Sequence, residues 1–168
     1  MTPLKACVTE VQAADHVVDT ARRGIGHWSA HVQAQSDLIS GDNTSAQTDA
    51  IWKRTRLAGP ADQKAYDAAV ADYEAVDGRG TCDEVAATSA NAADCAERMQ
   101  ALGPALGAGR GGMADWAAHL EAMADHAAGE FGGAHAQQMW EDTYRAAPEN
   151  INEFQRADGA LGKAPACT

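Results

Sequence analysis

The side chains best suited to chemistry gather between residues 119 and 139. Met123 and His126 are three residues apart, and His135 and Met139 are four apart, so each pair would share one face of a helix. A turn between these two segments places His126 across from His135 and Met123 across from Met139. Two imidazoles and two thioethers form a soft-to-borderline donor set, which suits copper and particularly Cu(I), with zinc as the second candidate.

His119 lies one helical turn before Met123, where it would be a fifth ligand or would orient the others. The simpler alternative is that the two methionines fill the core and that His126 and His135 flank helix ends, where an imidazolium is mildly stabilising. His119 also has a counterpart in His31. These two could meet as a second histidine pair, for which a hydrogen-bonded structural role is the simpler interpretation.

No enzyme signature accompanies this cluster. The sequence lacks Gly-x-Ser-x-Gly, His-Glu-x-x-His, the Glu-x-x-His of di-iron bundles and the Cys-x-x-Cys-His of c-type haem attachment. The glycine run at 107–112 is not followed by the Gly-Lys-Ser/Thr of a phosphate loop. The sequence therefore favours a binding protein over an enzyme.

The elements that must position these residues are two copies of one unit. Trp28 and Trp116, like Trp52 and Trp140, are 88 positions apart. The same shift aligns further identical residues, among them Cys7 with Cys95, Gly24 with Gly112, His31 with His119 and Gly41 with Gly129. We divide the single domain 1–168 into repeat one, about 1–80, and repeat two, about 89–168. At the positions of four candidate ligands, repeat one has Gln35, Leu38, Gln47 and Ile51.

Each repeat is predicted to form an αα-hairpin. Apolar residues recur every seven positions over 11–39 and again over 99–120, which indicates one buried seam in each copy. Gly41 and Gly129 suit the ends of these helices. Thr44 and Gln47 form a capping-box pattern that starts the return helix of repeat one.

Prolines and glycines predict irregularities. Each return helix is expected to be kinked or interrupted, at Gly59-Pro60 or at Ala147-Pro148, and glycines over 103–112 suggest a bend or fraying. Residues 77–91 form the connection. Two matching seams are buried best against each other, so we expect an all-α fold, a four-helix bundle of two tandem αα-hairpins with approximate internal two-fold symmetry. A large ring from the sister repeat is expected to fill each notch left by Gly24 and Gly112.

The four cysteines occur singly rather than as Cys-x-x-Cys, which favours disulfides over a zinc knuckle. The two legs of the first hairpin match in length and bring Cys82 back beside Cys7, and the repeat then pairs Cys95 with Cys167. A local Cys82–Cys95 bridge would break the symmetry. Two disulfides predict an extracytoplasmic protein, secreted or at the cell surface.

The net charge of -11 disfavours nucleic acid and anionic lipid as partners and favours cations. No stretch is apolar and long enough to cross a bilayer. Alanine supplies much of the hydrophobic content, whereas aromatic residues are only 5%, which favours helices.

The segment Trp116-Ala-Ala-His119-x-x-x-Met123, followed by Trp140 and a C-terminal Ala-Pro-Ala-Cys167, resembles a group of exported, actinobacterial-type helical proteins. The resemblance covers roughly 95–168 and implies export and helices without an assigned activity. The chain departs from that pattern at Ala118, where the group has a histidine.

These observations predict an extracytoplasmic metal-binding four-helix bundle that binds, stores or delivers copper through His126, His135, Met123, Met139 and His119. The alternative is a metal-free structural or interaction module whose partner is another protein.

Overall fold

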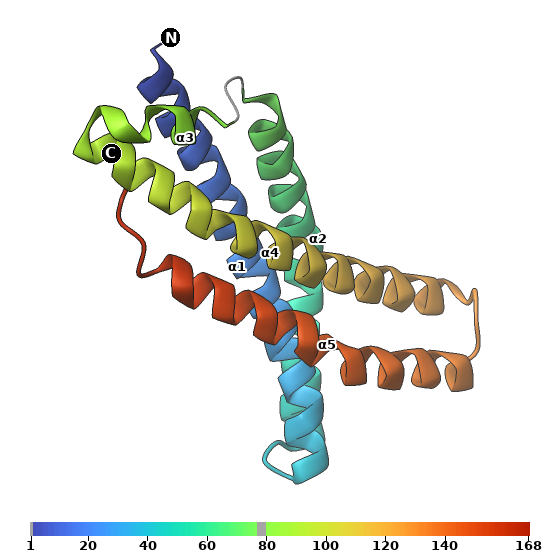
Figure 1. Ribbon diagram of the computed structural model, residues 1–168. Coiled ribbons are helices and arrows are strands. Elements are labelled where there is room, and N and C mark those ends of the chain that lie inside the picture. The colour runs from blue at the N-terminus through green and yellow to red at the C-terminus, as the bar shows by residue number, and fades with distance from the viewer. Residues whose placement is uncertain (1, 77–79) are drawn as a thin grey trace.

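The computed structural model describes residues 2–76 and 80–168, and the described part is all-helical. Four long helices, α1 (Pro3–Ser40), α2 (Ser45–Ala75), α4 (Ala90–Ala128) and α5 (Gly133–Leu161), form two antiparallel hairpins (Figure 1). The connection between the hairpins holds the short helix α3 (Thr81–Val85) and a 3-10 turn (Ala86–Thr88). Residues 77–79 of the predicted connection lie outside the described residues.

The hairpin ends follow the sequence signals. Gly41 and Gly129 have φ angles of 85° and 84°, in the left-handed region that glycine adopts without a Cβ penalty. The side chain of Thr44 accepts a hydrogen bond from the Gln47 amide, and the Gln47 side chain accepts one from the Thr44 amide, so the predicted capping box is present.

Proline does not interrupt the return helices. α2 continues through Pro60 and α5 continues through Pro148, so of the predicted kink or interruption the interruption is wrong. Each proline removes one amide donor from a helix of 31 or 29 residues, and the remaining backbone bonds sustain the helix. α4 is helical from Ala90 to Ala128, so of the bend or fraying predicted at its glycines the fraying is wrong.

The two hairpins cross, and beyond the crossing their tips point away from each other, the α1–α2 tip at the bottom and the α4–α5 tip at the right (Figure 1). α1 packs against both α2 and α4, whereas among the described residues no Cα atom of α2 lies within 8 Å of a Cα atom of α5. The arrangement therefore confirms the all-α class, while the finer expectation of a four-helix bundle with internal two-fold symmetry is not confirmed.

Reciprocal contacts hold α1 against α4 at the crossing. A Cβ placed on Gly24 would lie 2.5 Å from Met113 Sδ, and one placed on Gly112 would lie 2.7 Å from Ile25 Cδ1. Each glycine notch is therefore filled by an aliphatic or thioether side chain of the sister repeat, which corrects the expectation of a large ring. Beside the notches, the fully buried rings of Trp28 and Trp116 stack with centroids 5.2 Å apart.

Disulfides Cys7–Cys82 and Cys95–Cys167 close the end opposite the hairpin tips, as predicted. The first links α1 to α3, and the second ties the C-terminal segment after α5 to the start of α4. No helix in the described part of the chain is apolar and long enough to cross a membrane.

Candidate functional site

The centre of the molecule holds a buried histidine pair. The Nε2 atoms of His31 on α1 and His119 on α4 are 3.3 Å apart, and each residue is only 2% exposed. The rings of Trp28 and Trp116 flank the pair, with Trp28 4.9 Å from His119 and Trp116 5.3 Å from His31 between centroids. The two histidines therefore meet as the sequence suggested, with the hydrogen-bonded geometry of its simpler interpretation.

The hydrogen-bond network assigns the protons of this pair. The Thr55 hydroxyl lies 2.9 Å from the Ile51 carbonyl oxygen and 3.1 Å from that of Trp52, and when it donates to either of them its oxygen accepts from Nδ1–H of His31 at 2.7 Å. Nε2 of His31 then accepts from Nε2–H of His119. In this tautomer Nδ1 of His119 is a buried lone pair, and it has no hydrogen-bond partner among the described residues.

The two repeats differ at this point. Thr143 occupies the position that corresponds to Thr55, but its hydroxyl donates to the Met139 carbonyl oxygen at 2.8 Å and to no histidine. The unpaired nitrogen of His119 is thus a feature of repeat two alone.

Both imidazoles are held neutral. Burial lowers the pKa of His31 to about 3, with smaller contributions from the neighbouring His119 and from the positive charge of Arg56. Burial alone lowers the pKa of His119 to about 4. At pH 7 both rings therefore offer unprotonated nitrogen, which is the form that accepts a hydrogen bond or binds a metal.

A cleft of about 380 Å³ lies beside this pair, since both histidines are among its lining residues. This volume is in the range of small-molecule sites. All four long helices line the cleft, through His31, Gln35, Asp49, Trp52, Lys53, Arg56, His119, Met123, His126, Ala127, Trp140 and Tyr144.

Some residues that line this cleft are identical at corresponding positions of the two repeats, and others differ. Two duplicated pairs line it, His31 with His119 and Trp52 with Trp140. The other lining residues differ between the repeats. Repeat one adds an amide and charged side chains (Gln35, Asp49, Lys53, Arg56), whereas repeat two adds a softer and less charged set (Met123, His126, Ala127, Tyr144).

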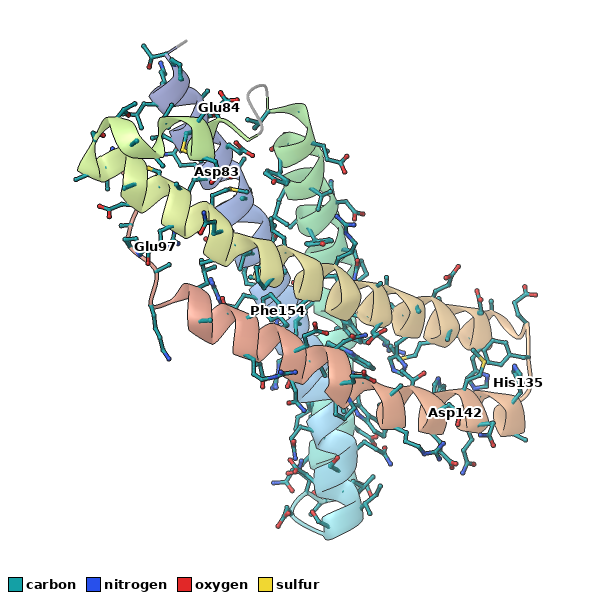
Figure 2. The ribbon with its side chains drawn as sticks, viewed as in Figure 1. Asp83, Glu84, Glu97, His135, Asp142 and Phe154 are labelled. Atoms are coloured by element: carbon teal, nitrogen blue, oxygen red, sulfur yellow. A yellow bond between two sulfur atoms is a disulfide. The ribbon has the colours of Figure 1, made fainter. Side chains whose placement is uncertain are left out.

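Three of the five predicted metal ligands line this cleft, and two do not. His119, Met123 and His126 follow one another along a face of α4, whereas His135 and Met139 are not among the lining residues. The exposed His135 lies at the tip of the second hairpin (Figure 2). The structure therefore does not gather the five predicted ligands into one group.

Phe131, which the sequence analysis did not consider, sits between the two histidines of the tip. Its ring is 5.6 Å from the His126 ring and 5.1 Å from the His135 ring, between centroids. Its carbonyl oxygen lies 3.2 Å from Nδ1 of His126. A donating Nδ1–H leaves Nε2 of His126 as a lone pair, for which no hydrogen bond is found in the described structure.

Sequence reasoning also missed the aromatic and cationic parts of the cleft. The sequence marked Trp52 and Trp140 as a duplicated pair, but their spacing did not predict that both are partly exposed and line the cleft. Lys53 and Arg56 are three residues apart on α2, and this spacing could have indicated two cationic side chains on one helix face. Across the described residues, no three His, Cys, Asp or Glu side chains form a group that could hold a metal ion.

Comparison with protein families, with curated proteins and with solved structures finds no match to the chain.

Proposed function

We propose that this protein binds a soft metal cation, copper in the Cu(I) state, in the cleft between the two hairpins. The ligands are His119, Met123 and His126 of α4. Met123 is one helical turn from each histidine, so a cation over its sulfur is within reach of both imidazoles. This site keeps three of the five ligands expected from the sequence and leaves out His135 and Met139.

The observation that carries the proposal is the pair of free nitrogen lone pairs beside one thioether. Among the described residues, the buried Nδ1 of His119 has no hydrogen-bond partner, and the low pKa of His119, about 4, keeps the ring neutral at pH 7. His126 has one nitrogen on the Phe131 carbonyl oxygen, which is the kind of contact that orients a metal-binding imidazole. Imidazole and thioether together favour Cu(I) over magnesium or calcium, and favour zinc less because the thioether is soft.

An aromatic ring beside the proposed ligands is further evidence for a cation site. The Trp140 ring lies 5.4 Å from the His126 ring between centroids, and tryptophan is the side chain whose face attracts cations most strongly. The net charge of -11 raises the local concentration of cations around the protein.

The reciprocal packing at the crossing also supports two tandem hairpins related by an approximate two-fold axis. Gly24 meets Met113 while Gly112 meets Ile25, so each repeat offers the other an equivalent notch and filler. The metal ligands then represent a specialisation of repeat two. The two disulfides are compatible with the proposed extracytoplasmic location, secreted or at the cell surface.

The test is a titration of the oxidised, metal-free protein with Ag(I), a redox-inert stand-in for Cu(I), followed by tryptophan fluorescence and calorimetry. We expect one site, and we expect Zn(II) to bind it more weakly. Met123→Leu keeps the apolar volume but removes the sulfur, and should weaken Ag(I) binding at least ten-fold.

Met139→Leu is the matched control, because Met139 lies outside the cleft. It should leave the affinity for Ag(I) unchanged. Absence of stoichiometric binding, or equal losses in the two variants, would overturn the proposed site.

A further inference from the structure

We propose that the same cleft binds a small aromatic molecule that carries an anionic group, such as a carboxylate or a sulfonate. This inference goes beyond metal binding and does not depend on it. A cleft of about 380 Å³ is much larger than a single ion requires, and its lining combines aromatic rings with cationic side chains that make no ion pair with the described residues.

The aromatic walls are held in place before any ligand binds. Nε1–H of Trp52 donates to the His31 carbonyl oxygen at 3.1 Å, which fixes that indole against α1. The Tyr144 ring packs on the His119 ring, with centroids 5.6 Å apart. Fixed rings offer a flat molecule stacking surfaces at a small entropic cost.

The cationic wall is on α2. Lys53 and Arg56 share one face of the helix and both line the cleft, and neither makes an ion pair in the described structure. Asp49 is the one acidic residue of the lining and lies one turn before Lys53, also without an ion pair there. The lining therefore carries one more positive than negative charge, in a protein of net charge -11.

A buried donor in the other wall also lacks a partner. Nε1–H of Trp140 is buried and makes no hydrogen bond within the part of the chain that the structure describes, although the duplicate Trp52 donates the same group to the His31 carbonyl oxygen. A buried donor without an acceptor is energetically unfavourable. A polar atom of a bound molecule would supply that acceptor.

The cationic wall and the aromatic wall of the cleft thus suit different parts of one bound molecule. Lys53 and Arg56 attract its anionic group, while Met123, Tyr144 and the indoles cover its apolar ring. A neutral aromatic molecule would leave both cations without a partner, and a small inorganic anion would leave the rings uncovered. An aromatic anion satisfies both requirements.

The experiment compares four probes by calorimetry on the oxidised protein in excess EDTA, which removes metal from the result. The probes are naphthalene-2-sulfonate, neutral 2-naphthol, cationic 2-naphthylmethylamine and the ringless methanesulfonate. We expect naphthalene-2-sulfonate to bind at least ten-fold tighter than each of the others. Equal binding of the anionic and cationic naphthalenes, or no binding of any probe, would overturn the inference.

Two arginines on α2 provide a matched pair of variants. Arg56→Gln should weaken binding of naphthalene-2-sulfonate about ten-fold and leave binding of 2-naphthol unchanged. Arg54→Gln removes the same charge from a residue outside the cleft lining and should change affinity less than two-fold. Equal losses in both variants would show a general charge effect and refute the site. Because EDTA is present throughout, this result is separate from the Ag(I) titration of Met123→Leu.

Discussion

Acidification should destabilise this protein through its buried histidine pair. Burial lowers the pKa of His31 to about 3 and that of His119 to about 4, whereas both histidines return to about 6.5 in the unfolded chain. Between these values the unfolded chain binds more protons than the folded protein. The free energy of unfolding therefore falls as the pH drops below about 6.5, and it does not depend on these two groups above pH 7.

The size of the effect follows from the two pKa differences. At pH 5 an unfolded histidine is almost fully protonated, while each buried histidine remains mostly neutral. Linkage then predicts a loss of about 2 kcal/mol per histidine, or about 4 kcal/mol for the pair. At pH 6 the loss is about 1 kcal/mol per histidine. Since small proteins are stable by about 5–15 kcal/mol, a shift of this size is readily measured.

The assay is urea unfolding at pH 7, 6 and 5, followed by the fluorescence of the tryptophans, two of which stack directly beside the pair. His119→Gln should remove about half of the pH dependence. His16→Gln, at an exposed position of α1, should leave it unchanged. A free energy of unfolding that stays constant between pH 7 and pH 5, or an equal dependence in the two variants, would refute the reasoning.

Two further predictions concern packing and covalent links. Gly112→Ala should destabilise by about 1–3 kcal/mol in urea unfolding, because its Cβ would lie 2.7 Å from Ile25 Cδ1, whereas Gly107→Ala in the same helix meets nothing within 4 Å and should stabilise by about 0.5–1 kcal/mol. A gain in stability for both variants would contradict the packing. Replacing Cys7 and Cys82 together by alanine should cost about 4 kcal/mol, since their bridge spans 75 residues, and an unchanged urea midpoint would argue against that bridge.

Local features of the sequence predicted the helices and their ends. Heptad spacing of apolar residues marked the buried seams, and glycine followed by a capping box marked the first turn at Gly41 and Thr44. These signals depend on backbone geometry within a few residues, so they can be read without knowledge of the fold. Proline was the exception, because the loss of one hydrogen bond at Pro60 is compensated by the rest of a long helix.

Hairpin length and the internal repeat together allowed the sequence to predict three long-range contacts. Equal leg lengths of a hairpin brought Cys82 back to Cys7, and the internal copy carried the same argument to Cys95 and Cys167. The shared offset likewise pointed to the meeting of His31 and His119. The rod-like shape of a helix makes such distances proportional to residue number, which is why spacing was sufficient.

The site itself depended on the tertiary structure. The spacing of residues in the sequence made Met123 and Met139 equivalent candidate ligands, but of these two only Met123 lines the cleft. The same spacing gave no reason to place Trp52 and Arg56 in the cleft. These outcomes follow from the angle at which the hairpins cross. That angle is set by the close fit of Gly24 against Met113 and of Gly112 against Ile25, side chains that are distant in the sequence. Periodicity within a helix specifies which of its faces is buried. The packing of that face against the other hairpin decides which side chains line the cleft between them.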